Sequence, residues 1–363
     1  MKLFIFGAGA SRGSTNKNVD NNKYQAPLAN ELLNSVYEEY AEELSLDINY
    51  LRATFERTKK DRSLEDWLSE LWKYSNQGGE GYTAEAAISL RGDLGKFAHY
   101  LRWMFQTIST HPGNNSLYKK LLIILREETQ KDIHHAFINF NYDTLFDIAF
   151  TKVWSRPLDN VDSYITQKIL KPHGSVNWLG QKRQEDGGIP GKSADNDWQN
   201  RYRFASVNLF KGSGLALTDY KYYDPGHNFL QKRDSIYSQD FGWDYFQPLI
   251  FLPLSEKIYS HIPELGKKIE EGAKTLFPNV SQIFLIGYQA NDELIHDWIE
   301  KYTTSKPPIL HVVSNSVEGA TEIMERVIKR HPKKLQKGKV FFDPSNTSFK
   351  NGFKTFVENY NKI

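Results

Sequence analysis

The sequence predicts an α/β fold, in which helices cover both faces of a parallel sheet and a large helical insertion follows the first strand. Short apolar runs alternate with amphipathic helical stretches along much of the 363-residue chain. Most of these runs are apolar throughout, as expected of strands that are covered on both sides. Residues 28–128, which lie between the first run and the second, carry helical periodicity alone.

The first element is a strand at Lys2–Phe6. The residues that follow it are small: Gly7, Ala8, Gly9, Ala10 and Ser11. Small side chains where a strand ends let backbone N–H groups approach an anion, usually a phosphate, at the start of the next helix. The dinucleotide fingerprint of dehydrogenases is incomplete, because Arg12 stands where a third glycine is required and no second strand ends in an acidic residue about 20 residues on. A tight turn without a ligand explains these five residues equally well.

The helical insertion contains four stretches with apolar residues three and four positions apart, at 28–44, 63–75, 94–108 and 117–130. Later strands are expected at 135–141, 164–179, 248–257, 282–288 and 308–315, and later helices at 261–277, 292–303 and 318–331. Residues 181–245 are rich in Gly, Tyr and polar residues, which is typical of an extended surface insertion.

These elements predict four parts of the chain. They are a discontinuous Rossmann-like domain formed by residues 1–27, 129–180 and 246–335, the helical insertion 28–128, the surface insertion 181–245, and a C-terminal tail 336–363 with about one strand and one helix.

Composition excludes several classes of protein. Lys and Arg number 46 against 44 Asp and Glu, a net charge of +2, so direct binding of nucleic acid is not expected. The chain has no cysteine, which excludes disulfides, thiolate nucleophiles and zinc sites built on thiolates, and its ten histidines show no metal-binding spacing. No apolar run approaches the ~20 residues that a membrane span needs, and the chain begins in a strand without a signal region. A cytoplasmic protein without bound metal is expected.

Polar residues and glycines follow the expected strands at their carboxyl ends, where such sheets bind ligands. Asn141 and Asp143 follow one strand, His173 lies on another, and Gly287 and Asn315 end the last two. Each has a structural explanation: a helix cap for Asn141, a first-turn acid for Asp143 and a turn histidine for His173. Their convergence on one edge of the sheet favours a ligand site.

Five segments occur in a fixed order: FGAGAS, NFNYDTL, LKPHGSVNW, PLIFLPLSEK and FLIGYQANDELI. Together they resemble the sirtuin-like domain of bacterial anti-phage defence NAD hydrolases. The resemblance implies a Rossmann-like pocket for NAD, here a substrate, and assigns Asn141 and His173 to the nicotinamide ribose and Asp143 to the vicinity of the carboxamide. It places Gly7, Ala8, Gly9, Ala10 and Ser11 near the phosphates, and Gly287 and Asn315 near the adenosine half.

The chain departs from deacetylating sirtuins in ways that change the expected reaction. Without cysteine, the four-cysteine zinc module of those enzymes and the acyl-lysine groove that it shapes cannot exist in that form. Their GxPDFR segment is missing, and Gln289 replaces the common serine after GY. Water is then the expected acceptor, with Asn141 placing it and His173 taking its proton, so the expected products are nicotinamide and ADP-ribose.

Two other functions stay open: an ADP-ribosyltransferase with a protein acceptor, and a non-catalytic nucleotide-sensing scaffold. A free NAD hydrolase would poison its own cell, so the activity is expected to be gated, by oligomerisation, a second protein or both. The resemblance implies a HerA-type ATPase as the favoured partner and an Argonaute-like protein as the second candidate, in a defence that depletes NAD.

Overall fold

The computed structural model describes residues 1–15, 22–43, 47–58, 62–77, 84–182, 219–222, 245–250, 263–345 and 351–360. Six strands form a parallel sheet: β1 (Lys2–Phe6), β2 (His135–Asn139), β3 (Ile169–Leu170), β7 (Gln282–Ile286), β8 (Ile309–Val313) and β9 (Gln336–Phe341). Their order is β3-β2-β1-β7-β8-β9. The chain builds outward from β1 on one side and then crosses to β7 on the other, so the β1–β7 boundary is the topological switch point.

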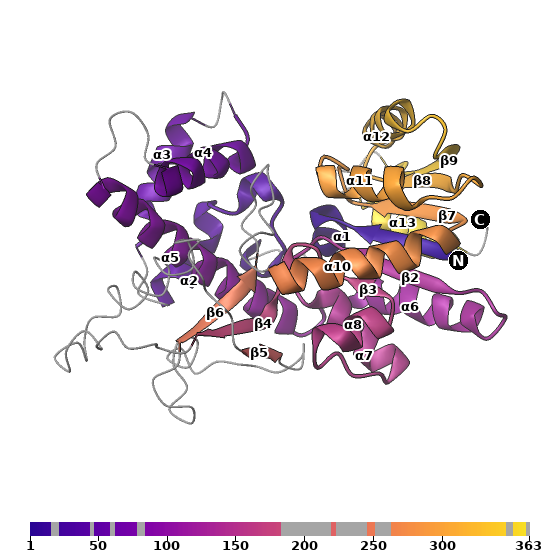
Figure 1. The fold of residues 1–363 in the computed structure, drawn as a ribbon, viewed down its shortest axis with the longest axis horizontal. Helices are drawn as coiled ribbons and strands as arrows, with labels where there is room; N and C mark the ends of the chain where they lie inside the picture. The colour runs from indigo at the N-terminus through magenta and orange to yellow at the C-terminus, as the bar shows by residue number, and fades with distance from the viewer. Residues whose placement is uncertain are drawn as a thin grey trace.

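Helices cover both faces of this sheet (Figure 1). One face carries α1 (Ala8–Ser14), α6 (Ser116–Thr129), α7 (Leu145–Trp154) and α13 (Gly352–Asn359), and the other carries α10 (Pro263–Leu276), α11 (Glu293–Tyr302) and α12 (Val317–Arg330). The predicted α/β fold is confirmed.

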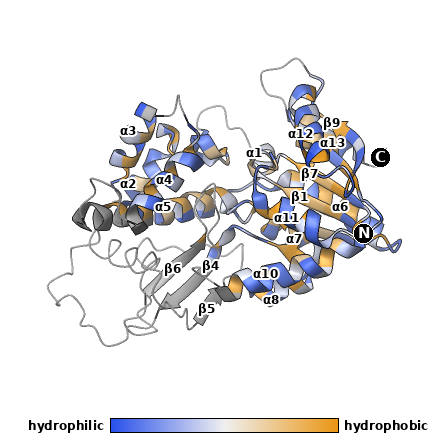
Figure 2. Ribbon diagram, turned by 45° about the horizontal axis from the view of Figure 1, so that its top comes forward, coloured by the Kyte–Doolittle hydropathy of each residue, from blue (hydrophilic) through white to orange (hydrophobic). Residues whose placement is uncertain are grey.

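The core lies between these layers, and hydropathy colouring shows the apolar strands enclosed by helices with polar outer faces (Figure 2). On the α6 face, the Phe4 ring stacks on Phe284 with 4.9 Å between centroids, and Phe6 contacts Tyr118, Phe146 and Phe353 from three helices. β1 is buried from Leu3 to Phe6, which explains why its sequence is apolar without alternation.

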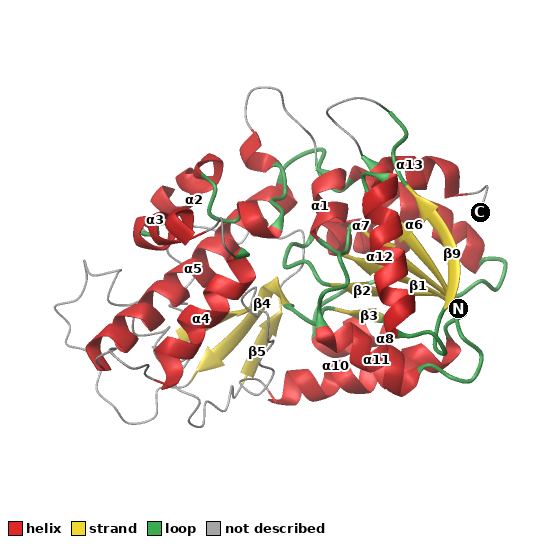
Figure 3. Cartoon of the chain, turned by 90° about the horizontal axis from the view of Figure 1, so that it is seen from above, coloured by secondary structure: helices red, strands yellow, loops and turns green. Residues whose placement is uncertain are grey.

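The helical insertion lies beside the sheet domain and contains α2 (Glu38–Glu43), α3 (Asn49–Thr58), α4 (Leu64–Gln77) and α5 (Ala84–Thr110) (Figure 3). The stretch 117–130, which was expected to belong to the insertion 28–128, is α6 and packs with α7 and α13 on the sheet domain instead. A second, antiparallel sheet of order β5-β4-β6 packs against α5. Its strands are β4 (Gly174–Lys182), β5 (Asp219–Tyr222) and β6 (Tyr245–Ile250). The stretch expected to be one helix at 28–44 instead contains two short 3₁₀ helices, Ala29–Glu31 and Ser35–Tyr37, before α2.

The strand expected at 164–179 is wrong in its first part. Helix α8 (Val161–Thr166) occupies that region, because Asn160 and Ser163 form a reciprocal capping box that starts a helix. β3 contains only two residues, and β4 leaves the parallel sheet. The strand expected at 248–257 likewise begins as β6, which pairs with β4, and residues 251–257 lie outside the described part of the chain.

Residues 336–345 and 351–360 belong to the sheet domain rather than to a separate tail. β9 pairs in parallel with β8, and α13 packs on α1 and α6. The start of α13 is tied to the end of β8, because the Asn315 Oδ1 atom accepts a hydrogen bond of 3.1 Å from the Gly352 amide. Periodicity identified both elements, but it carries no information on which strand is their neighbour. None of the described helices has the length and apolarity needed to cross a membrane.

Candidate functional site

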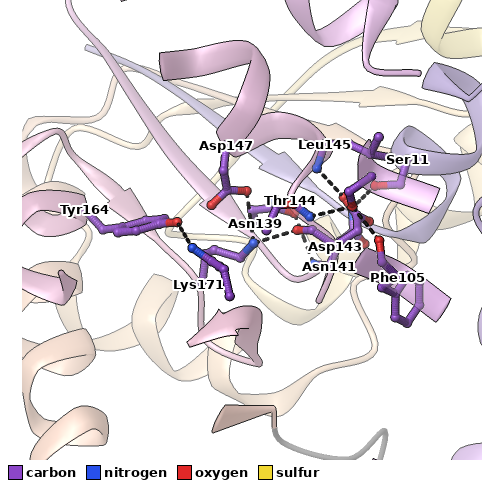
Figure 4. A network of polar contacts seen from close by, with 12 residues as sticks. Ser11, Phe105, Asn139, Asn141, Asp143, Thr144, Leu145, Asp147, Tyr164 and Lys171 are labelled. Atoms are coloured by element: carbon purple, nitrogen blue, oxygen red, sulfur yellow. Dashed lines mark hydrogen bonds and ion pairs between the residues drawn. The ribbon is translucent and has the colours of Figure 1, made fainter. Parts of the chain in front are cut away.

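Asn141 and Ser11 meet at the carboxyl edge of the sheet, beside the switch point (Figure 4). Asn141 follows β2, and its Nδ2 atom donates hydrogen bonds of 2.9 Å to the Gly7 carbonyl oxygen and 2.9 Å to Ser11 Oγ. Ser11 Oγ also lies 3.1 Å from the Tyr118 hydroxyl. Both amide hydrogens of Asn141 are therefore used within the protein, which leaves Oδ1 as the atom suited to accept a hydrogen bond from water or a hydroxyl.

Asp143 lies on the same segment and is buried. Its Oδ1 atom accepts a 3.0 Å hydrogen bond from the Leu145 amide at the start of α7. Burial raises the pKa of Asp143, against the opposing influence of the Lys171 charge and a hydrogen bond with Ser11. The carboxyl group thus helps to hold Ser11 and, through it, the Asn141 amide.

Two charged residues that the sequence analysis did not single out, Lys171 and Asp147, lie beside this segment (Figure 4). Lys171 Nζ lies 3.0 Å from Asp147 Oδ2, and both side chains are fully buried. Nζ also donates a 2.7 Å hydrogen bond to the Asp143 carbonyl oxygen. A charged residue in the apolar stretch LFDIAF was the available signal for this buried pair. The pair fixes the backbone of the Asn141–Asp143 segment.

His173 lies next to the same segment, between β3 and β4. Its ring packs edge-on against Phe140, with 4.9 Å between centroids, and also contacts Tyr142. Asn141 stands between these two aromatic residues in the sequence, so the structure places His173 next to the segment that carries Asn141. Phe140 in turn stacks on Tyr288, with 4.5 Å between centroids, across the end of β1.

Asp292, at the start of α11, is a further residue that the sequence analysis did not single out. Its Oδ2 atom lies 2.6 Å from His173 Nε2, and both side chains are mostly buried. The available signal was the position of Asp292 immediately before a helical stretch, which predicts an N-cap but does not reveal a partner 119 residues away.

The glycines after β1 make a close-packed turn. The Gly7 amide donates to the Ile286 carbonyl oxygen, the Gly9 amide to the Gly287 carbonyl oxygen, and the Ala10 amide to Gly7. A Cβ atom added at Gly9 would lie 2.9 Å from Gly287 Cα, and Gly287 has φ +56°. The amides of Gly7, Gly9 and Ala10 are thus used within the protein, and the residues serve the tight turn that the sequence analysis left as an alternative.

Asn315 has a structural contact as well, because its Oδ1 atom accepts the Gly352 amide at the start of α13. A hollow of about 810 Å³ lies at the opposite, amino edge of the sheet, where Met1, His134 and Lys168 contribute to its lining. The hollow therefore lies at the opposite end of the strands from every predicted site residue. Among the described residues, no three His, Asp or Glu side chains gather closely enough to hold a metal ion.

The carboxyl edge contains the Asn141 amide, the His173 imidazole paired with the Asp292 carboxylate, and the packed rings of Phe140 and Tyr288. An amide oxygen can orient water, and an imidazole can take a proton near neutral pH.

Compared with known proteins, the chain matches no family model and no curated protein.

Proposed function

We propose that the protein hydrolyses NAD at the bond between nicotinamide and ribose. The observation that carries the proposal is that His173 packs against Phe140 and Tyr142, the two chain neighbours of Asn141, at the carboxyl edge beside the switch point of a Rossmann-like sheet. The order of sequence segments that resemble sirtuin-like NAD hydrolases supports the same site.

The chemistry suits these two side chains. The C1′–N bond of NAD breaks toward an already cationic leaving group, so no strong acid is required. In the proposed step, Asn141 Oδ1 orients a water molecule, the water oxygen bonds to C1′, and His173 takes the water proton while nicotinamide leaves with the bonding electrons. The products are nicotinamide, ADP-ribose and a proton.

The glycine turn, residues 7–10, limits how the proposed site can bind the pyrophosphate of NAD, because its amides already donate hydrogen bonds within the protein. Phosphate contact through the Gly7, Gly9 and Ala10 amides requires these amides to leave their present acceptors on β7 and in the turn itself. In the observed conformation these three amides are occupied, so the proposed enzyme contacts the pyrophosphate through them only after the glycine turn itself rearranges. This arrangement supports a gated effector, with a HerA-type ATPase or, second, an Argonaute-like protein as the proposed regulatory partner, and with homo-oligomers as the proposed active form.

The test is an NAD-consumption assay with the full chain, alone and with each protein that neighbouring genes encode. His173→Ala and Asn141→Ala should each lower turnover by about 10²–10⁴-fold. His134→Ala and Asn160→Ala, which change the same residue types away from the site, should keep the wild-type rate. With labelled NAD, the label should be recovered as free ADP-ribose rather than on protein, which separates a hydrolase from a transferase. Wild-type rates in folded His173→Ala and Asn141→Ala proteins would disprove the proposed site.

A further inference from the structure

We propose that Asp292 is a positioning residue that sets the tautomer of His173, with the proton on Nε2 and the lone pair on Nδ1. Its catalytic consequence rests on the function proposed above, whereas the tautomer itself does not. The Asp292 Oδ2 atom lies 2.6 Å from His173 Nε2. An ionised carboxylate can only accept hydrogen bonds, so Nε2 must be the donor. The neutral ring then carries its basic lone pair on Nδ1.

The Asp292 carboxylate is held in place from its own side. It is the N-cap of α11, where Oδ1 accepts a 3.1 Å hydrogen bond from the Leu294 amide. One oxygen therefore serves the helix and the other serves His173. The preceding turn is fixed by a 2.9 Å hydrogen bond from His296 Nε2 to the carbonyl oxygen of Ala290, a residue with φ +52°.

The imidazole is held from the other side by aromatic rings. Phe140 packs edge-on against His173, and the same Phe140 ring stacks on Tyr288, which belongs to the turn that ends in Asp292. The two side chains of the pair are 11% and 10% exposed, so solvent screens their interaction weakly. Ring orientation and tautomer are thus fixed by one turn, residues 287–292.

The consequence for the proposed reaction is that the base acts through Nδ1. Without the carboxylate, the neutral ring divides between two tautomers, and only one of them presents a lone pair at that atom. Asp292 touches no reacting atom in this scheme, and it acts through His173.

Two substitutions separate this role from helix capping. Asp292→Ser keeps an oxygen that can cap α11 but is too short to reach His173. Asp292→Asn keeps the cap and places an NH₂ group against Nε2, which favours the opposite tautomer, with the proton on Nδ1. Asn160→Ala, which removes the N-cap of α8, is the control for loss of a cap elsewhere.

The primary measurement is the ¹⁵N NMR spectrum of the histidine ring nitrogens in the full chain, with His173 assigned from a His173→Gln variant. The wild type should show a protonated Nε2 and an unprotonated Nδ1 in the neutral ring, Asp292→Asn the reverse, and Asp292→Ser a mixture. NAD turnover should fall by about tenfold or more in both variants, and more in Asp292→Asn, without reaching the full loss expected for removal of the base. Affinity for NAD in calorimetry should stay within about twofold, since the Asp292 carboxylate contacts His173 and the start of α11 but no atom of NAD in this scheme.

A wild-type spectrum with the proton on Nδ1 would overturn the proposal without any variant, as would unchanged His173 signals in both variants or wild-type turnover in a folded Asp292→Asn protein. If the wild type consumes no NAD under any condition, the proposed function fails, and the ring-nitrogen spectra alone still decide whether Asp292 sets the tautomer.

Discussion

The two edges of the parallel sheet differ in packing and in charge. At the carboxyl edge, the β7–α11 turn contacts the glycine turn, and Phe140 stacks on Tyr288. At the amino edge, Glu128 of α6 pairs with the partly exposed Lys2 and the buried His135, and a hollow of about 810 Å³ is lined by other residues of that edge, from α8 and α10 among them. This hollow and the predicted catalytic side chains therefore lie at opposite ends of the same strands. The hollow lies at the amino edge, whereas the side chains suited to chemistry lie at the carboxyl edge.

The largest expected effect on stability tests how tightly the carboxyl edge is packed. Gly9→Ala places a Cβ atom 2.9 Å from Gly287 Cα and 3.1 Å from the Gly287 carbonyl oxygen, and backbone atoms cannot rotate away. We expect the free energy of unfolding in urea to fall by about 1–3 kcal/mol.

The matched control is Gly319→Ala in α12, where the added Cβ would meet only the hydroxyl oxygens of Ser316 and Ser314, at 3.3 and 3.4 Å. There the change should be neutral or stabilising by up to about 1 kcal/mol, because alanine favours a helix. Equal effects of the two substitutions would show that the glycine turn is not close-packed.

The next effect is the opposite pH response of the two edges. Burial raises the pKa of Asp143 above its ordinary 3.8, so this group lowers stability as pH rises from 3.8 through the raised pKa. Burial also acts to raise the pKa of Glu128, but hydrogen bonds from Lys2 and His135 outweigh it and the pKa is lowered below its ordinary 4.5. Glu128 therefore contributes stability above pH 4.5, and this contribution is lost as pH falls through the lowered pKa.

Unfolding measured between pH 3 and 6 should reveal this contrast. Relative to the wild type, Asp143→Asn should gain stability with rising pH, and Glu128→Gln should lose it, each with a slope of at most about 1.4 kcal/mol per pH unit. Slopes of the same sign in the two variants would contradict the assignment of opposite shifts.

The smallest effect is expected at the hollow. Lys168, which contributes to its lining, has φ +60°, a conformation that costs a side chain about 1 kcal/mol relative to glycine. Lys168→Gly should raise the unfolding free energy by up to about 1 kcal/mol in urea and leave NAD turnover unchanged. Lys168→Ala removes the same charge but keeps the strain, so it should give no gain. A loss of turnover in both variants would place function at the amino edge.

Much of the fold was predictable, because buried parallel strands and amphipathic helices have strong local signatures. β1, β2, β7 and β8 lie where apolar runs predicted them, and α6, α11 and α12 where helical periodicity did. The prediction was wrong where a local signal competed with the pattern, as at α8, whose capping box starts a helix inside an apolar run. It was also incomplete where pairing decided the result, since β4 and β6 form their own sheet and β9 joins the parallel one.

By itself, the sequence determined about where β1, β2, β7 and β8 end, and with them the edge at which Asn141 and Asp143 lie, because parallel strands present their carboxyl ends on one side. It did not determine the strand end beside His173, because β3 ends inside the strand expected at 164–179. Only the tertiary structure decided the partners of these residues. The pair His173–Asp292 and the pair Lys171–Asp147 join positions far apart in the chain, and neither residue of either pair carries a local signal for the other. The same holds for the glycine turn. Its sequence is compatible with amides that face a ligand or a neighbouring strand, and the pairing of β7 with β1 directs the Gly7 and Gly9 amides to carbonyl oxygens of residues 286 and 287.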